Sequence, residues 1–442
     1  MFNQSFDNMR NTRIPIARII FALCCMLTLP LTLRAEEVKE YIVIRKQGAE
    51  KIAIVLDKTT AKGDRESEWG KSLDSTIKGG LDYTGFFNLL SAPLNIRNAQ
   101  DGAINFGAIS SVGSDIYVTG PVSRKSGAPN LDMHVYDITG KQLLNRTYTG
   151  TDKQLREIGL RFCADLVELL TGKKSVFGTK IVFVSNRTGA KELYMCDFDG
   201  QEVEQITNTR SISLTPAVSQ DGKYLAWTDY TSGRPDLYIK NLATKVTAVV
   251  RKPGVCIDPG WVPGTDECAT TLSIDGDQEI YLIRADGTLS RRLTKSKGID
   301  VSPTFSPQGS RMAFVSTREG RPHIFIQDLK SGAVHRLTFS GNYNTQPAWS
   351  PVSDKILYSS MQKNGEINIF MINADGTGLL QLTSGTKANE YPSWSPDGSM
   401  VVFSSNRQGR RKLFIMNSDG TNQRPLLQMD GEQQQPSWSI LK

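Results

Sequence analysis

The sequence predicts an α/β N-terminal domain followed by an all-β six-bladed β-propeller that is closed by the C-terminal strand. Three observations lead to this fold class. The C-terminal three-fifths of the chain repeats about every 44 residues. Each repeat has room for four short strands, as a propeller blade requires. The N-terminal part has no such period, and two of its segments carry apolar residues at helical spacing.

A proline opens each repeat, and successive prolines are 43 to 45 residues apart. Around it lies a variant of Pro-x-Trp-Ser-Pro-Asp-Gly, of which residues 392–398 are the best copy. An apolar strand, a glycine-containing loop, an alternating strand and a turn follow, and the turn often contains Asp-Gly, which tolerates positive φ. This pattern is typical of WD40-like (PD40) repeats. The six prolines are Pro216, Pro259, Pro303, Pro347, Pro392 and Pro436.

The two ends of the repeat region determine the number of blades. Residues 177–207 supply three strands but lack the leading one, whereas residues 432–441 supply only a leading strand. Joining these two pieces completes one blade and closes the ring without a covalent link. Five complete units and this composite one predict six blades. Closure also protects sheet edges that would otherwise promote aggregation.

The first part of the mature chain is expected to be a compact α/β domain. Leu155, Ile158 and Phe162 lie on one face of a predicted helix over 152–170, which Thr171-Gly172 ends. The propeller follows at once, so we expect the two parts to pack together with little linker. The other predicted elements are a helix over 69–90 and strands over 41–45, 51–57, 115–119, 131–138 and 142–148.

The N-terminus predicts an export signal. Arg10, Arg13 and Arg18 precede an apolar stretch over 19–33, which is too short for a comfortable membrane span. An uncleaved anchor is the alternative. We therefore expect a signal peptide over 1–35, the α/β domain over 36–172 and the propeller over 173–442, with the mature chain outside the cytoplasm. No later stretch is expected to span a membrane. The formal net charge is +7, but the sequence contains no dense run of Lys and Arg, so no nucleic-acid partner is expected.

Four cysteines follow the predicted signal: Cys163, Cys196, Cys256 and Cys268. None shows the CxxC spacing of zinc or thioredoxin-like sites. Cys256 and Cys268 could pair in an oxidising compartment, but we expect buried free thiols.

Motifs of enzyme chemistry are not found. The segment Gly70-Lys71-Ser72 resembles the end of a phosphate loop, yet Arg65 occupies the position where that loop needs glycine. No G-x-S-x-G elbow occurs, and three histidines show no metal-ligand spacing. We expect a binding protein without catalytic activity, cofactor or metal. An exported propeller hydrolase and a carbohydrate-binding propeller are the alternatives.

One face of the propeller is the predicted partner site. Loops that enter the innermost strands and loops that join the two middle strands share that face. The middle loops carry Arg187, Arg234, Arg318, Arg321, Arg407 and Arg410, which predict a partner with an acidic or amide-rich surface. The predicted entry-loop residues are Leu214, Thr215, Ile257, Asp258, Asp300, Val301, Ser302, Asn344, Thr345, Gln346, Asn389, Glu390 and Tyr391.

The export signal, the domain order, the junction Leu170-Thr-Gly-Lys-Lys-Ser-Val-Phe-Gly-Thr-Lys-Ile-Val-Phe183 and the six repeats together resemble the TolB family, the periplasmic components of the Tol–Pal system of Gram-negative bacteria. The resemblance covers nearly the whole exported chain. The first two full repeats depart from it, since Val218-Ser219-Gln220 and Trp261-Val262-Pro263 replace Trp-Ser-Pro.

The resemblance implies a binding function. The propeller face would bind the lipoprotein Pal through the entry residues named above. The segment Glu36, Glu37, Val38, Lys39, Glu40, Tyr41 and Ile42 would engage the inner-membrane protein TolA. The system would support outer-membrane integrity and envelope constriction during cell division. Colicins bind some family members at the Pal site, which makes a colicin a candidate partner.

Overall fold

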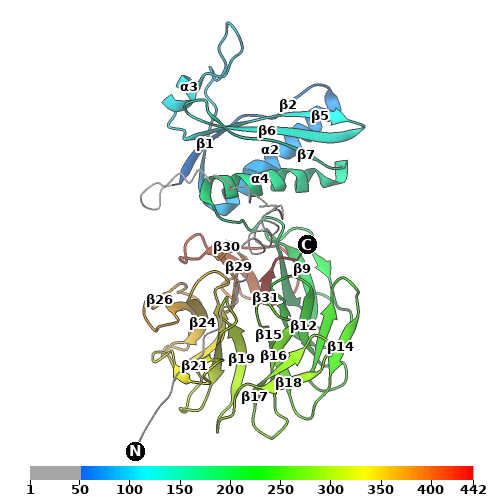
Figure 1. Cartoon of the computed structure of the whole chain (residues 1–442), viewed down its shortest axis with the longest axis vertical. Helices are drawn as coiled ribbons and strands as arrows, with labels where there is room; N and C mark the ends of the chain where they lie inside the picture. Colours follow the sequence, from blue (N-terminus) through cyan, green and yellow to red (C-terminus); the bar gives the residue numbers. More distant parts are fainter. Residues whose placement is uncertain (1–50, 442) are drawn as a thin grey trace, which may run out of the picture. The chain divides into compact units, whose positions relative to one another are not determined.

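The structure is a computed structural model that describes residues 51–441. The predicted signal over 1–35, the predicted TolA segment over 36–42 and the predicted strand over 41–45 lie outside the described residues. Figure 1 shows an α/β domain followed along the chain by a ring of four-stranded sheets. The predicted fold class is confirmed.

The N-terminal domain is built on a mixed seven-stranded sheet. Its strand order is β2-β5-β6-β4-β1-β3, and β7 pairs with β6. Strand β1 runs parallel to β3 and β4, whereas β6 runs antiparallel to β4, β5 and β7. The strands are β1 (Ile52–Leu56), β2 (Thr60–Ala61), β3 (Phe87–Leu90), β4 (Ile116–Thr119), β5 (Pro121–Lys125), β6 (Ala128–Asp137) and β7 (Gln142–Thr149).

Two helices, α2 (Asp64–Thr84) and α4 (Leu155–Thr171), cover one face of this sheet (Figure 1). Side chains alternate between the faces of a strand, so Ile54 packs with the helices while Val55 packs on the opposite face with Ile109. The latter belongs to the short helix α3 (Phe106–Ser111). A 3₁₀ turn, η2 (Asp152–Gln154), leads into α4.

The predicted helix over 69–90 is wrong at its C-terminal end. The helix stops at Thr84, because Gly85 adopts the left-handed conformation with φ of 72° and caps it. The next residues form β3, where Phe87 is buried in the sheet. Strands β2, β3 and β5 and helix α3 were not predicted, and all four are short. The predicted strands over 51–57, 115–119, 131–138 and 142–148 and the helix over 152–170 are confirmed.

Six four-stranded antiparallel sheets form the propeller. Each complete blade runs outward from the axis in chain order. The five complete blades consist of β11 (Ser213–Val218), β12 (Tyr224–Asp229), β13 (Asp236–Asn241) and β14 (Thr247–Val250); β15 (Cys256–Trp261), β16 (Glu267–Leu272), β17 (Glu279–Arg284) and β18 (Leu289–Arg292); β19 (Asp300–Phe305), β20 (Arg311–Ser316), β21 (His323–Asp328) and β22 (Val334–Arg336); β23 (Tyr343–Trp349), β24 (Lys355–Met361), β25 (Ile367–Asn373) and β26 (Leu380–Gln381); and β27 (Asn389–Trp394), β28 (Met400–Ser405), β29 (Lys412–Asn417) and β30 (Arg424–Pro425).

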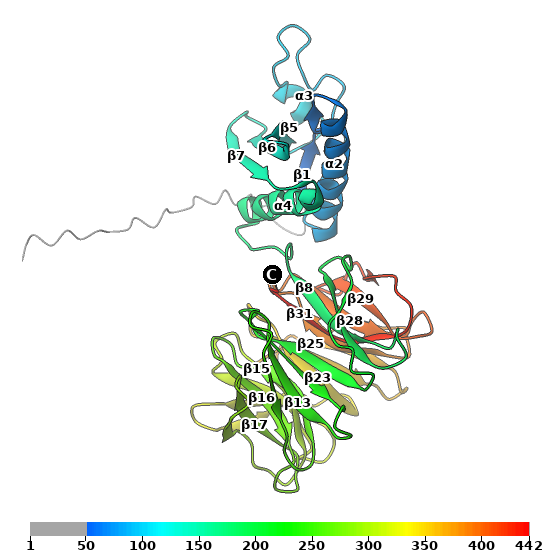
Figure 2. The ribbon, with the colours of Figure 1, turned by 90° about the vertical axis from the view of Figure 1, so that its right-hand side faces the viewer.

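The composite blade is confirmed. Its innermost strand is β31 (Gln433–Ser439), which pairs antiparallel with β8 (Lys180–Ser185), and Figure 2 shows the two side by side. Strands β9 (Glu192–Asp197) and β10 (Glu204–Gln205) complete the sheet. The indole of Trp438 is buried and donates to Thr179 Oγ1 at 2.8 Å. The two ends of the propeller therefore hold each other through backbone pairing and one buried aromatic side chain.

Direct contacts join the α/β domain to the composite blade. The guanidinium of Arg156 on α4 pairs with Asp197 and Asp199, at 2.7 Å for the second. The hydroxyl of Tyr83 on α2 donates to the Phe198 carbonyl at 2.6 Å. The expectation of close packing without a long linker agrees with these contacts.

Candidate functional site

The residue before each repeat proline has the same unusual backbone conformation in all six blades. Each has φ between 47° and 56°, and none is glycine. In every innermost strand, the pairing with the next strand shifts register at this point. Such a shift is a β-bulge, which bends the strand and redirects a side chain. The six residues are Thr215, Asp258, Ser302, Gln346, Tyr391 and Gln435.

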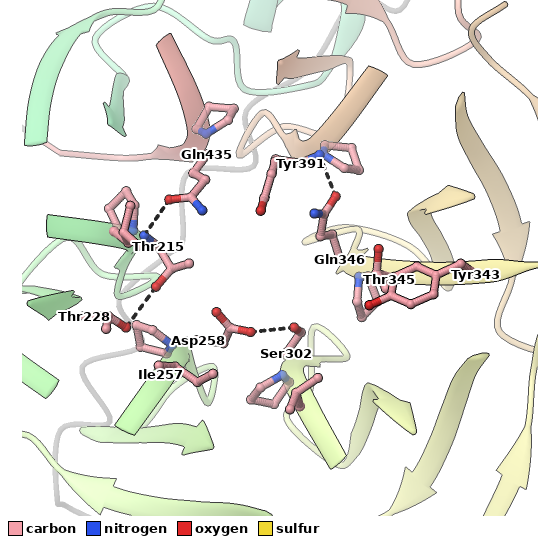
Figure 3. Close-up of a pocket in the computed structure, with 18 of the residues that line it drawn as sticks. Thr215, Thr228, Ile257, Asp258, Ser302, Tyr343, Thr345, Gln346, Tyr391 and Gln435 are labelled. Atoms are coloured by element: carbon pink, nitrogen blue, oxygen red, sulfur yellow. Dashed lines mark hydrogen bonds between the residues drawn. The ribbon is translucent and has the colours of Figure 1, made fainter. Parts of the chain in front are cut away.

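These six side chains line a central cavity of about 460 Å³. Figure 3 shows labelled members from different blades facing one another across it. Five further residues line the cavity with apolar or hydroxyl side chains: Leu214, Ile257, Val301, Thr228 and Thr345. Tyr230, Tyr343 and the six repeat prolines complete the lining. This cavity presents polar and apolar surface in about equal measure, and its size is within the range of binding sites.

Hydrogen bonds between neighbouring blades hold the lining in place (Figure 3). Gln435 Oε1 accepts from the Thr215 backbone N–H at 2.9 Å, and Gln346 Oε1 accepts from the Tyr391 N–H at 2.9 Å. The Ser302 hydroxyl donates to Asp258 Oδ2 at 2.8 Å. These bonds stabilise a backbone conformation that costs about 1–2 kcal/mol per non-glycine residue. The cavity is therefore a preorganised feature of the ring.

The electrostatics of the cavity depend on Asp258. Burial among the surrounding atoms raises the pKa of its carboxyl above the ordinary range, and the Ser302 hydrogen bond opposes this shift. Burial also raises the pKa of the Tyr391 hydroxyl, and the nearby charges of Glu390 and Asp258 act in the same direction.

Nine of the thirteen predicted entry residues line this cavity: Leu214, Thr215, Ile257, Asp258, Val301, Ser302, Thr345, Gln346 and Tyr391. They do not lie in loops, however. All of them belong to the first halves of the innermost strands, because pairing with the second strand begins before the proline and continues beyond the bulge. The prediction that these residues lie in loops is therefore wrong, although their side chains do line the central cavity.

The other four predicted residues do not line the cavity. Asp300, Asn344 and Asn389 are fully buried, and Glu390 is largely buried in an ion pair with Arg411 at 2.7 Å. Each of the three buried residues occupies the beginning of an innermost strand, where its side chain bonds to other parts of the ring.

The predicted ring of arginines divides into two groups. Arg318 pairs with the buried Asp300 at 2.8 Å, and Arg407 donates to Asn389 Oδ1 at 3.0 Å. Both guanidinium groups also lie over phenylalanine rings of their own blades. These two arginines bind buried side chains of their own blades. The exposed ones are Arg187, Arg234, Arg321 and Arg410.

Sequence reasoning missed several lining residues. Gln435 precedes the sixth repeat proline, so the repeat itself could have identified it. Thr228 and Tyr230 come from the second strand of a blade and its following loop, which carry no repeated motif. Residues of the predicted TolA segment, 36–42, lie outside the described residues.

Exposed apolar side chains also gather on the face of the entry segments. Phe339 is 75% exposed, Tyr343 47%, Ile299 45% and Ile212 42%. All four precede or begin an innermost strand, so propeller topology places them on the same face as the cavity, and Tyr343 lines the cavity itself. Exposed apolar groups with a polar surround are characteristic of protein interaction sites.

Among residues 51–441, no group of three or more His, Cys, Asp or Glu side chains is arranged to hold a metal ion. The described helices include none that is long and apolar enough to cross a bilayer. The four cysteines of this part are free and buried, which agrees with the expectation of unpaired thiols.

Two family models match the chain. Residues 40–144 match the TolB amino-terminal domain, and residues 167–442 match the TolB beta propeller domain.

Curated relatives and a solved structure agree with these matches. The chain is 70% identical over 405 residues to the protein TolB homolog of Chlorobaculum tepidum, covering 92% of this chain and 93% of the relative. It is 40% identical to the Tol-Pal system protein TolB of Desulfosudis oleivorans, over 64% and 66% of the two chains. The crystal structure of TolB from Acinetobacter baumannii superposes with a TM-score of 0.76 at 25% identity, covering 88% and 97%.

Proposed function

The chain belongs to the TolB family, and from that premise we propose that it is a periplasmic scaffold of the Tol–Pal system that binds Pal through its propeller face. By the family resemblance, the system supports outer-membrane integrity and envelope constriction during division. The export signal expected over 1–35 agrees with a periplasmic location.

The observation that best supports the proposed face is that a preorganised cavity and exposed apolar side chains lie on the same side of the propeller. Six bulged strands fix the cavity walls, so partner binding requires little ordering of the propeller. Preorganised surfaces lose less conformational entropy on association. Tyr343 lines that cavity, and Phe339 is exposed in the loop that precedes the strand of Tyr343. Aromatic residues frequently dominate binding energy.

The proposal for TolA depends on the segment Glu36–Ile42 and rests on the family resemblance, since this segment lies outside the described residues. The segment contains three glutamates, one lysine and the apolar or aromatic residues Val38, Tyr41 and Ile42. The scaffold would then engage Pal with one part and TolA with another, and a colicin would compete at the Pal face. In this proposal the protein acts by binding, and no catalytic step is assigned to it.

The test is a titration of the exported chain against purified Pal from the same organism, by calorimetry. The double substitution Phe339→Ser with Tyr343→Ser should raise Kd at least tenfold, because it removes the aromatic contacts. The matched control is Val246→Ser, which changes an exposed apolar residue in a turn at the opposite end of a blade and should leave Kd unchanged. If the folded wild-type chain does not bind Pal, the proposal is contradicted.

A separate titration tests the TolA part. A chain that begins at residue 43 should bind Pal but lose TolA, while the chain that begins at residue 36 should bind both. Equal TolA binding by the two chains would contradict the assignment of the segment.

A further inference from the structure

One carboxylate lies unpaired by any cation inside the central cavity. Among the described residues that line it, Asp258 is the only acidic side chain, and none is lysine, arginine or histidine. Burial of an ionised carboxylate without a counter-charge is unfavourable. The raised pKa of Asp258 reflects that cost. A residue that destabilises the free protein at the centre of a binding face is a candidate functional group.

The backbone directs this carboxylate at the cavity. Asp258 has φ of 55° within the bulge of its strand, and Figure 3 shows its side chain projecting between those of neighbouring blades. Among the described residues, its hydrogen-bond partner is Ser302, which donates to Oδ2. Oδ1 is therefore left to accept from an incoming donor.

The walls around the carboxylate are suited to an apolar stem. Ile257, Val301 and Leu214 line the cavity with the six repeat prolines, which have no backbone N–H to offer. The amide oxygens of Gln346 and Gln435 already accept backbone hydrogen bonds. The cavity thus combines apolar wall segments with uncharged polar groups and one accessible negative charge.

We propose that the cavity binds one cationic group carried on an apolar stem, as in a lysine or arginine side chain of the protein partner, with Asp258 as its counter-charge. Such side chains bury their methylene groups along apolar surfaces and place the charge at a polar site. This inference rests on the proposed function and adds the chemistry of the partner. The partner would present one basic side chain to the cavity, surrounded by acidic groups that meet the exposed arginines of the middle loops.

A divalent metal ion fits these residues less well. Calcium takes six to eight oxygen ligands and magnesium six, whereas the lining supplies one carboxylate and its Gln oxygens are already bonded. The experiment must therefore distinguish the binding of a metal ion from the binding of an organic cation.

The experiment uses small probes, so that it does not depend on Pal. The exported chain is titrated with n-butylammonium and n-butylguanidinium, and with n-butanol and calcium chloride as the alternatives, while NMR follows the carboxyl carbon of Asp258. We expect both organic cations to shift this signal with saturation in the millimolar range and to bind at least ten times more tightly than n-butanol.

Variants identify the group responsible. Asp258→Asn keeps an oxygen that accepts from Ser302 but removes the charge, and it should weaken both cations at least tenfold in ligand-observed NMR. Asp258→Glu should retain most of the binding. The matched control is Asp277→Asn, an exposed carboxylate in the loop between β16 and β17 of the same blade, which should change nothing. Melting curves confirm that each variant is folded.

Three results would overturn the inference: equal binding of n-butanol and the cations, unchanged cation binding by Asp258→Asn, or saturation by calcium without any by the organic cations. The Pal titration is read separately. If the probes bind as expected but Pal does not, the proposed partner is wrong and the cation site stands. If Pal binds equally well to Asp258→Asn, the cation site is not used by Pal.

Discussion

At the scale of single residues, the polar groups at the start of each innermost strand have two distinct tasks. Those before the proline face the cavity, while those at the first strand position are buried and hold neighbouring strands. Asp300 and Asn389 have the second task, since each accepts from an arginine of its own blade. The sequence alone could not separate these tasks, because the two kinds of residue are only one or two positions apart. The β-bulge between them decides which side chain points to the axis.

Arg318 is expected to contribute to stability and not to partner contact. Arg318→Ala leaves the buried Asp300 without its cation and should cost about 3 kcal/mol of unfolding free energy, near the lower end for a broken buried ion pair because the guanidinium is 21% exposed. Arg321→Ala, on the same loop but exposed, should stay within about 0.5 kcal/mol of wild type. Urea unfolding measures both. Equal effects would contradict the division of the arginines.

Asp258 should reduce the stability of the free protein at neutral pH. Its folded-state pKa is raised, so the folded chain binds more protons than the unfolded chain between the two pKa values, and stability falls as pH rises through that window. Asp258→Asn should therefore have the higher urea midpoint at pH 7. The difference should disappear near pH 3, below the ordinary pKa of aspartate. A lower midpoint for the variant at pH 7 would contradict this reasoning.

The thiols of the described part should be inert in the folded state. Burial raises the pKa of Cys196 and of Cys256 to about 12, and it raises those of Cys163 and Cys268 further. The thiolate is the reactive form, so all four should resist alkylation in the native protein and react in urea. Mass spectrometry counts the labels. Two unreactive thiols in urea without reductant would instead indicate the Cys256–Cys268 disulfide.

At the scale of elements, the repeat predicted the architecture well, since a motif that recurs six times reports the same packing six times. The predicted closure by residues 432–441 agrees with the pairing of β31 and β8. Boundaries were less predictable. Helix α2 ends where Gly85 turns left-handed, and the apolar residues Phe87, Leu89 and Leu90 that follow it belong to β3. Tertiary burial of Phe87 in the sheet decided the outcome.

The closure strand should be essential for the propeller. Deletion of residues 432–442 removes β31, exposes the edge of β8 and uncovers the buried partners of Trp438. We expect a loss of the cooperative melting transition of the propeller, followed by circular dichroism and tryptophan fluorescence. Trp438→Ala alone should cost about 3–5 kcal/mol. A truncated chain that melts as wild type does would refute the composite blade.

At the scale of the whole molecule, exposed arginines and exposed apolar side chains gather on the face that we propose for partner binding. Exposed arginines lie in the middle loops, Phe339 and Tyr343 lie on the same face, and one carboxylate lies in the cavity. The sequence predicted this face because propeller topology fixes which loops share an end. It could not predict that two of the six arginines would fold inward onto phenylalanine rings.

The exposed arginines should act mainly on the rate of association. Arg321→Glu with Arg410→Glu should slow Pal association severalfold at low salt and flatten its dependence on ionic strength, because rim charges steer encounter and are screened by salt. Lys245→Glu, in the exposed turn between β13 and β14 at the other end of a blade, is the matched control. Stopped-flow fluorescence measures the rates. An unchanged salt dependence would contradict steering by this rim.

The most direct test of the central claim is hydrogen exchange of the exported chain with and without saturating Pal. The account predicts slower exchange in the segments 339–346 and 386–391 and in the loops between the middle strands, with unchanged exchange in the Asp-Gly turns at the opposite end of the blades. Protection confined to those opposite turns, or no protection by bound Pal anywhere on the cavity face, would contradict it.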